Sequence, residues 1–271
     1  MRIRATSRVL TVIGDPIDHS LSPAMYNAAI AALGLDAVYV ALRVEPAALA
    51  HVIRAFEAVG MSGNVTVPHK MPVASLLIRL TSIAKELGAV NTFWSEGGRL
   101  IGDNTDVQGV LDAVQALNVD GPWVVVGTGG AARAVAAAAR AERESILVRS
   151  RDPDRAHEFV AWAKSLGVEA RSDDGSAVGV VINASPLGLN EHDSHPVPDD
   201  RLARCRAVLD LVYRPGGTPW VRQCRERGML VADGRNMLVG QGARAFERFF
   251  PGETAPREIM ASAVERELAG R

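Results

Sequence analysis

Residues Trp123–Val135, "WVVVGTGGAARAV", predict a β-strand, a glycine-rich turn and an α-helix in succession. Four apolar residues, typical of a buried parallel strand, lead into Gly127, Gly129 and Gly130, and an alanine-rich helical segment follows directly. Glycines in such a turn let the backbone approach a phosphate and direct a helix N-terminus at it, as a dinucleotide site requires. The spacing departs from the common G-x-G-x-x-G pattern, so a tight strand-to-helix turn without a ligand stays open.

The next strand of this unit, residues 145–148, ends in the basic loop "RSRDPDR" about 20 residues beyond the glycine turn. At this point dinucleotide-binding folds carry an acidic residue for the ribose hydroxyl of NAD, or an arginine for the 2′-phosphate of NADP. Arg149, Arg151 and Arg155 therefore favour NADP. Asp152 and Asp154 stand in the same loop, so the strictness of that preference and a merely solvated loop both stay open.

On either side of this stretch, short apolar runs alternate with segments of helical periodicity, and this pattern predicts an α/β protein of two units. A largely parallel sheet is expected from residue 9 to about 90, with Ser22 capping its first helix and a hairpin turning on Gly97 and Gly98. The expected strands of the first unit are 8–14, 37–42 and 62–67, its helices 22–34 and 45–60, and its hairpin 91–104. Beyond a helix at 106–117 and the polar junction 118–122, the expected strands are 178–185, 207–213 and 228–233, and the helices 154–167, 236–250 and 256–270.

The composition of the chain argues against a nucleic-acid-binding, a membrane-spanning and a secreted protein. The 271 residues carry a net charge of −1, so there is no basic surplus for nucleic acid or an anionic membrane. No apolar stretch approaches the ~20 residues that span a bilayer, and the apolar run near the start is too short for a secretion signal. Cys205 and Cys224 read as reduced thiols of a cytoplasmic protein.

Lysine is scarce in this chain: of its 30 lysine and arginine residues, 27 are arginine. One of the three lysines, Lys70, ends the stretch "GNVTVPHK" directly after an apolar strand and a proline. Lysine can lose its proton when its surroundings lower its pKa, whereas arginine effectively cannot. Lys70 is therefore a candidate proton carrier, with a purely structural charge as the alternative.

Ten short motifs stand in order along nearly the whole chain: "GDPIDHSLSP", "GNVTVPHK", "GAVNT", "GDNTD", "GTGGAAR", "SR", "INASPLG", "DLVY", "ADGRNML" and "QGARAF". With these motifs the chain resembles the shikimate dehydrogenase family, whose members reduce 3-dehydroshikimate to shikimate with NADPH. The resemblance implies an N-terminal βαβ substrate lobe, residues 1–105, completed by C-terminal helices 237–271. It also implies a Rossmann-like NADP-binding lobe, residues 106–236, with a cleft between the lobes.

The resemblance also implies roles for individual residues. Ser20 and Ser22 would hold the substrate carboxylate with help from Tyr213, and Lys70 with Asp106 would form the catalytic pair. Hydroxyl groups of the substrate would be bound by Thr66, Asn91 and Gln241. NADP would be held by Gly127, Thr128, Gly129, Gly130, Ala131, Ser150, Arg151, Arg155, Leu211 and Gly234. The chain departs from the family where Asp152 and Ser150 flank Arg151 in place of an Asn-Arg-Thr run, where Ser82 replaces an acidic residue, and where Leu211 replaces a methionine.

Local chemistry leaves some of these roles open. Ser22 also reads as a helix cap, and Asp106 as the N-terminal charge of the following helix. Lys70 is a proton carrier in one reading and a polarising hydrogen-bond donor in the other. His192 and His195 lie in a polar loop, and no metal is expected.

The predicted function is the NADP-dependent, reversible reduction of 3-dehydroshikimate to shikimate in chorismate and aromatic amino-acid biosynthesis. One alternative is a quinate/shikimate dehydrogenase that uses NAD. Another, of a different class, is a non-catalytic sensor of the same ligands, which the presence of both Lys70 and Asp106 disfavours. No nucleic acid or membrane is expected as a partner, and the oligomeric state stays open, with a homodimer among the options.

Overall fold

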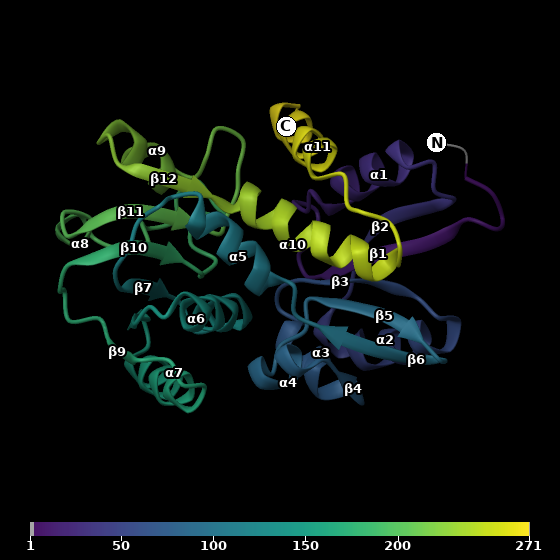
Figure 1. The fold of residues 1–271 in the computed structure, drawn as a ribbon, viewed down its shortest axis with the longest axis horizontal. Helices are drawn as coiled ribbons and strands as arrows, with labels where there is room; N and C mark the ends of the chain where they lie inside the picture. Colours follow the sequence, from purple (N-terminus) through teal and green to yellow (C-terminus); the bar gives the residue numbers. More distant parts are fainter. Residues whose placement is uncertain (1–2, 271) are drawn as a thin grey trace. The chain divides into compact units, whose positions relative to one another are not determined.

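The computed structural model describes residues 3–270 and divides the chain into two α/β units. The first unit comprises Met1–Thr105 with Leu238–Arg271, and the second comprises Asp106–Met237 (Figure 1). Each unit is built on its own six-stranded sheet. The predicted α/β class with two units is confirmed.

The sheet of the first unit has the strand order β2-β1-β3-β5-β6-β4. Its strands are β1 (Arg8–Gly14), β2 (Ala37–Arg43), β3 (Ser62–Val65), β4 (Arg79–Leu80), β5 (Thr92–Glu96) and β6 (Arg99–Asp103). Strand β1 pairs in parallel with β2 and β3, but β5 runs antiparallel to both β3 and β6. Strand β4 pairs in parallel with β6, so β5 alone among the six strands of this sheet is reversed, and the expected largely parallel sheet is confirmed.

Helices cover both faces of this first sheet. They are α1 (Ser22–Ala32), the 3₁₀ turn η1 (Pro46–Ala48), α2 (Leu49–Val59), α3 (Lys70–Leu76), α4 (Ser82–Leu87), α11 (Arg257–Ala269) and the part of α10 (Gly234–Phe249) that belongs to the unit. On one face Tyr26 of α1 stacks on Tyr39 of β2 with ring centroids 4.3 Å apart, and α11 packs beside α1. On the other, Phe56 of α2 stacks on Phe93 of β5 at 5.7 Å. Burial of these rings fixes the sheet between its helices.

The sheet of the second unit is wholly parallel and has the order β12-β11-β10-β7-β8-β9. Its strands are β7 (Trp123–Val126), β8 (Ile146–Arg149), β9 (Ala170–Ser172), β10 (Val178–Asn183), β11 (Cys205–Asp210) and β12 (Leu230–Asp233). This is the doubly wound order of dinucleotide-binding folds, in which the direction of winding reverses between the first and fourth strands, here β7 and β10. Ligands of such sheets bind at the carboxyl edge beside that reversal.

The helices of the second unit lie on both faces of its sheet (Figure 1). They are α5 (Asp106–Gln115), α6 (Gly130–Glu142), α7 (Pro153–Ser165), α8 (Asp199–Leu202) and α9 (Pro219–Glu226). Alanines of α6 pack directly on β7, since their small side chains allow helix and strand to approach closely. Leu202 and Trp220, from α8 and α9, belong to the core on the opposite face.

Several short elements differ from the sequence expectations. Helices α3, α4, α8 and α9 and strands β4 and β9 fall outside the predicted set, because most are too short to show a periodic pattern. Helix α9 did carry a readable start signal: Thr218 accepts a hydrogen bond from the N–H of Val221, and Pro219 occupies the first turn. Within residues 3–270, no helix combines the length and apolarity needed to cross a bilayer.

Candidate functional site

In the first unit, several predicted substrate residues gather at one edge of the sheet, where β1 and β3 end and β5 begins. The N–H of Thr66 donates to the carbonyl of Ile13 at 2.9 Å, and the N–H of Val65 donates to the carbonyl of Asn91 at 2.8 Å. A Cβ at Gly14 would lie only 2.5 Å from Cγ2 of Thr66, so only glycine permits this approach of the two strand ends. Because β5 runs antiparallel to β3, its first residues reach the edge at which β3 ends.

Lys70 is the first residue of α3 and lies at this same edge. Its carbonyl accepts a hydrogen bond from the N–H of Val90 at 2.8 Å, which places its backbone one residue from Asn91. The preceding His69 is buried, and its Nε2 lies 2.6 Å from the carbonyl oxygen of Val44. The Lys70 backbone is thus anchored on both sides, and its side chain is partly exposed.

Asn91 and Gln241 meet although 150 residues separate them. Nδ2 of Asn91 donates to Oε1 of Gln241 at 3.2 Å and to the hydroxyl of Thr105 at 2.9 Å. Oδ1 of Asn91 accepts from the N–H of Thr105 at 2.7 Å. Both amides are buried, with 2% and 7% of their surface exposed. The first unit therefore holds two of the predicted hydroxyl-binding side chains in a pre-formed polar cluster.

Ser20 and Ser22 stand at the start of α1, but not in the predicted way. The N-cap residue is Leu21, no side chain caps the helix, and Ser22 is already in its first turn. The prediction that Ser22 caps α1 is therefore wrong, because the helix begins one residue earlier than the pattern suggests. Instead, Oγ of Ser20 accepts the N–H of Ser22 at 3.3 Å. Both hydroxyls lie near the positive end of the helix dipole, where a carboxylate is stabilised.

In the second unit, the glycine turn has the geometry that a dinucleotide site needs. Gly127 has φ of +112°, and a Cβ there would lie 2.9 Å from the carbonyl oxygen of Ala184, the residue after β10. Gly129 is the N-cap of α6 and offers no side-chain acceptor to the first helical N–H groups. The uncapped end of α6 thus lies beside the reversal between β7 and β10.

The basic loop after β8 presents two arginines to solvent. The side chains of Arg151 and Arg155 are exposed, and neither has an ion-pair partner within residues 3–270. The carboxylate of Asp152 caps α7 by accepting the N–H groups of Asp154 at 3.0 Å and Arg155 at 3.3 Å. Asp152 is the residue that left the preference for NADP over NAD open in the sequence. Its carboxylate bonds to backbone N–H groups and not to the guanidinium of Arg151 or Arg155. Ser150 shapes the same turn by accepting the N–H of Asp152 at 3.2 Å.

Leu211, Tyr213 and Gly234 come together where β11 and β12 end. A Cβ at Gly234 would lie 2.4 Å from the carbonyl oxygen of Leu211 and 3.2 Å from Cδ1 of Tyr213. Only glycine permits this contact. Asp106 is buried and is the first residue of α5 in this unit. This position also suits a structural role, in which a negative charge stabilises the N-terminus of the helix.

Beneath these loops lies a buried carboxylate, Asp210, that the sequence pattern did not single out. Oδ1 of Asp210 accepts from Nδ2 of Asn183 at 2.8 Å and from the N–H of Val212 at 3.1 Å, and Oδ2 accepts the hydroxyl of Thr218 at 2.7 Å. Burial raises the pKa of Asp210 to about 6. Asp210 and Asn183 stand in the motifs "DLVY" and "INASPLG", so the signal was present, but nothing local shows that the two side chains meet.

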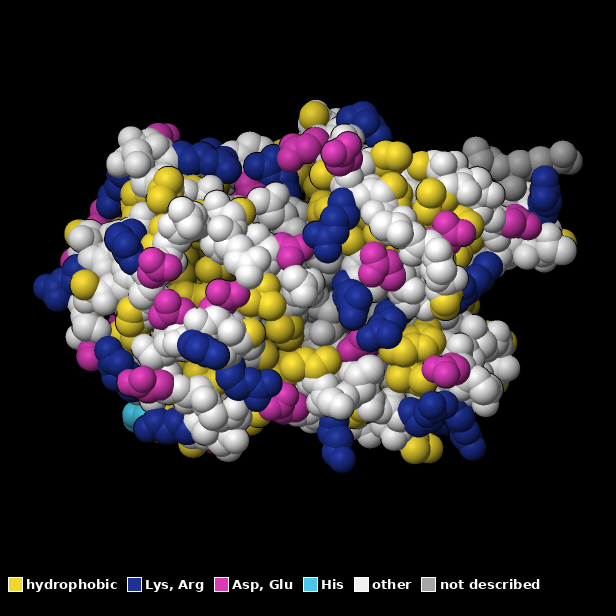
Figure 2. All heavy atoms as spheres, viewed as in Figure 1, with side chains coloured by type: hydrophobic (Ala, Val, Ile, Leu, Met, Phe, Trp, Pro, Cys, Tyr) yellow, Lys and Arg dark blue, Asp and Glu magenta, His cyan; other side chains and the backbone are white. Residues whose placement is uncertain are grey.

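Charge is evenly mixed over the surface. Basic and acidic side chains are interspersed on the face shown in Figure 2, in agreement with a net charge of −1. Within residues 3–270, no three His, Cys, Asp or Glu side chains are grouped so that they could hold a metal ion.

Comparison with known proteins identifies the family. The profile described as "Shikimate dehydrogenase substrate binding domain" matches residues 12–93, and "Shikimate 5'-dehydrogenase C-terminal domain" matches residues 234–265. A shikimate dehydrogenase (NADP(+)) of Symbiobacterium thermophilum is 41% identical over 99% of this chain and 97% of its own length. One of Nitrosopumilus maritimus is 34% identical over 95% and 98%. A crystal structure of shikimate 5-dehydrogenase from Thermus thermophilus with NADP(H) and shikimate is 34% identical, covers 96% of this chain and 100% of its own, and has a TM-score of 0.86. The chain therefore belongs to the shikimate dehydrogenase family, as its ten motifs predicted.

Proposed function

We propose that this protein catalyses the NADP-dependent, reversible reduction of 3-dehydroshikimate to shikimate. The observation that carries the proposal is the gathering of hydroxyl, amide and lysine side chains at one edge of the first sheet. A polyhydroxylated ring acid requires such paired donors and acceptors, and a site built to bond hydroxyls rejects analogues that lack them. The relatives named as NADP-dependent shikimate dehydrogenases, similar over nearly their whole length, support the assignment.

In the proposed binding mode, Ser20 and Ser22 hold the substrate carboxylate at the start of α1, with Tyr213 assisting. Thr66, Asn91 and Gln241 bond the ring hydroxyls. The existing bonds of Asn91 support this role, since fixed amides lose little conformational entropy when substrate binds.

The residues around the glycine turn fit a dinucleotide phosphate, because a Cβ at Gly127 would collide with backbone and α6 has no side-chain cap. We therefore assign the pyrophosphate to Gly127, Thr128, Gly129, Gly130 and Ala131. Ser150, Arg151 and Arg155 would hold the 2′-phosphate, and Leu211 and Gly234 would border the nicotinamide. Arg151 and Arg155 form no ion pair with any residue from 3 to 270, which supports NADP as the cofactor.

In the proposed mechanism, bound NADPH supplies the hydride that the ring carbonyl carbon receives. The carbonyl oxygen then becomes an alkoxide and must be protonated. Lys70 donates that proton or stabilises the developing charge through a compact ammonium, and Asp106 orients the lysine. In the reverse direction Lys70 accepts the proton from the shikimate hydroxyl.

Steady-state rates with shikimate and quinate, each with NADP and NAD, test the proposal. We expect kcat/KM to be highest for shikimate with NADP. Faster turnover of quinate with NAD would indicate the quinate/shikimate alternative. Tight ligand binding without turnover would indicate the sensor. We place the enzyme in the cytoplasm, and light scattering in solution tests the homodimer.

A further inference from the structure

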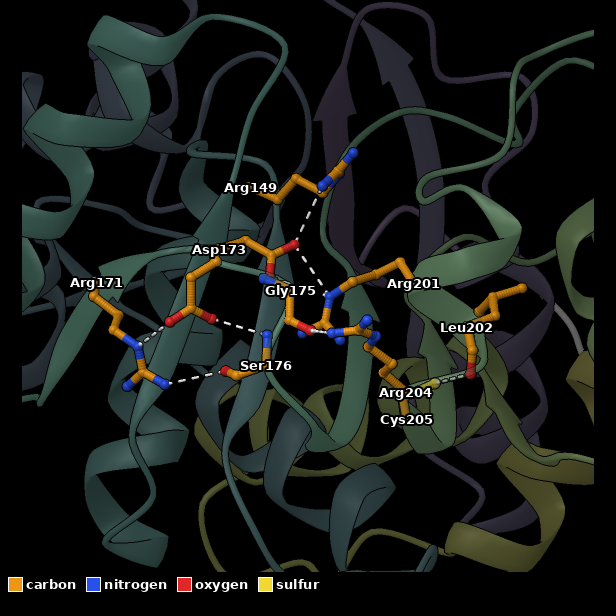
Figure 3. A network of polar contacts seen from close by, with 10 residues as sticks. Arg149, Arg171, Asp173, Gly175, Ser176, Arg201, Leu202, Arg204 and Cys205 are labelled. Atoms are coloured by element: carbon orange, nitrogen blue, oxygen red, sulfur yellow. Dashed lines mark hydrogen bonds and ion pairs between the residues drawn. The ribbon is translucent and has the colours of Figure 1, made fainter.

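Three charged side chains form a network at the end of β8 and β9 (Figure 3). Asp173 follows β9, and its two carboxylate oxygens accept from Nε of Arg201 at 3.1 and 3.2 Å. Oδ2 of Asp173 also accepts from Nη1 of Arg149 at 3.2 Å, and Oδ1 accepts from the N–H of Gly175 at 3.2 Å. Arg149 is the last residue of β8. The carboxylate thus lies between two guanidinium groups.

The two arginines differ in exposure. Side chains of Asp173 and Arg201 are 3% and 4% exposed, whereas that of Arg149 is 39% exposed. Nη1 and Nη2 of Arg201 have no hydrogen-bond partner in the described chain, and Asp173 is its only ion-pair partner there. Arginine stays protonated even when buried, so Arg201 alone neutralises Asp173. One positive charge remains in excess, and it reaches solvent at Arg149.

This excess charge lies where a dinucleotide-binding sheet receives the adenosine ribose. That position is the carboxyl end of the strand that follows the glycine-turn helix, here β8 after α6. The carbonyl of Arg149 accepts the N–H of Gly127 at 2.9 Å, so the residue is one hydrogen bond from the glycine turn. Arg151 and Arg155 carry no ion pair within residues 3–270, and so Arg149 is the one arginine of this loop whose guanidinium is anchored before a ligand arrives.

We propose that Arg149 is a specificity-determining contact for the 2′-phosphate of NADP, held in place by the buried pair of Asp173 and Arg201. Nη1 stays on Asp173, while Nε and Nη2 donate to phosphate oxygens. An anchored guanidinium loses little side-chain entropy on binding, which favours NADP over NAD. The inference rests on the proposed use of NADP and adds to it a residue outside the "SR" motif of the family.

Direct titration calorimetry with NADP and with NAD, in the absence of substrate, tests this. Arg149→Gln should weaken NADP binding by about 10- to 100-fold, the range of one charge-assisted contact, and change NAD binding less than about twofold. Arg171→Gln is the matched control. Arg171, on the neighbouring β9, forms an ion pair with Asp174 at 3.2 Å, and both side chains are exposed. Loss of this pair should leave the affinities for NADP and NAD unchanged.

Arg149→Lys tests the anchoring itself. Lysine keeps the charge but cannot bridge a carboxylate and a phosphate as the guanidinium fork does. A clear loss of NADP affinity in Arg149→Lys supports a fixed fork, and wild-type affinity would show that charge alone acts. If the wild type prefers NADP and Arg149→Gln binds NADP with the same affinity as the wild type, the inference fails and the proposed function stands. If the wild type shows no preference for NADP, both fail.

Discussion

At the scale of single residues, Lys70 combines a fixed backbone with a reversible charge. Its carbonyl is bonded to Val90 and its neighbour His69 is buried, so a change of side chain should leave the local backbone in place. The chain uses arginine for 27 of its 30 lysine and arginine side chains, which makes a retained lysine informative.

Lys70→Arg should lower kcat by about 10²- to 10⁴-fold, because a bulky and permanently charged guanidinium cannot exchange the proton. The KM for shikimate should change far less, since the loss belongs to the transition state. Lys85→Arg, at an exposed position near the end of α4, is the control and should keep wild-type rates. A Lys70→Arg enzyme that retains more than about a third of wild-type kcat would return Lys70 to a structural role.

The two serines at the start of α1 should separate binding from stability. Ser22 caps nothing, so Ser22→Ala should leave the melting temperature close to that of the wild type while raising the KM for shikimate about tenfold or more. Ser20→Ala removes the acceptor for the N–H of Ser22 and should lower stability by about 0.5–1 kcal/mol as well. Thermal melts with shikimate kinetics measure both, and unchanged KM values would place the carboxylate elsewhere.

At the scale of elements, the turn between β7 and α6 contains glycines of two kinds. Gly127 has positive φ and would bring a Cβ into backbone, whereas a Cβ at Gly129 would meet no atom within 4 Å. Gly127→Ala should therefore destabilise the fold by about 1–3 kcal/mol. Gly129→Ala should melt like the wild type but bind NADP more weakly, because its methyl group occupies the proposed phosphate approach. Equal effects of the two changes on stability would contradict this division.

Asp210 joins the loops after β10 and β11 and should make stability depend on pH. Burial raises the pKa of Asp210 to about 6, above the ~3.9 of an unfolded aspartate. The folded state therefore binds the proton more tightly, and the free energy of unfolding should fall as pH rises from about 4 to about 6, by about 2–3 kcal/mol from this group.

Asp210→Asn should remove that slope, as measured by urea denaturation at pH values from 4 to 7. The asparagine can still bond Thr218 and Val212, so the fold is retained. Asp174→Asn is the control: hydrogen bonds from Ser176 hold the pKa of this exposed carboxyl below its usual value, and its contribution lies at lower pH. An identical pH slope in Asp210→Asn and wild type would refute the assignment.

At the scale of the whole molecule, each unit has its own sheet and its own core, and each carries a different group of proposed ligand contacts. Shikimate alone should therefore slow amide hydrogen exchange mainly in residues 18–22, 64–70 and 89–92. NADP alone should slow it mainly in residues 127–131 and 149–155. Exchange measured by mass spectrometry with each ligand reads this directly, since bound ligand suppresses local opening. Protection of residues 127–131 and 149–155 by shikimate alone, or of residues 18–22 and 64–70 by NADP alone, would reverse the assignment.

Features that depend only on neighbouring residues were predictable from the amino-acid sequence. The glycine turn predicted at Gly127 has a positive φ of 112°, which favours glycine. Gly97 and Gly98 turn the β5–β6 hairpin, as predicted, with φ of 62° and 73°. Helix periods and apolar runs predicted most long elements, because local steric and hydrophobic preferences act within a few residues. The family motifs added the proposed site residues, since each motif is a contiguous string.

Contacts between distant parts of the chain, in contrast, depend on the complete fold. The pairing of β3 with β5, the meeting of Asn91 with Gln241, and the enclosure of Asp210 all bring together side chains or strands far apart in sequence. The buried charge of Arg201 is also of this kind, because its counter-ion Asp173 lies 28 residues away. Burial and desolvation depend on everything packed around a group, and no local pattern encodes that environment.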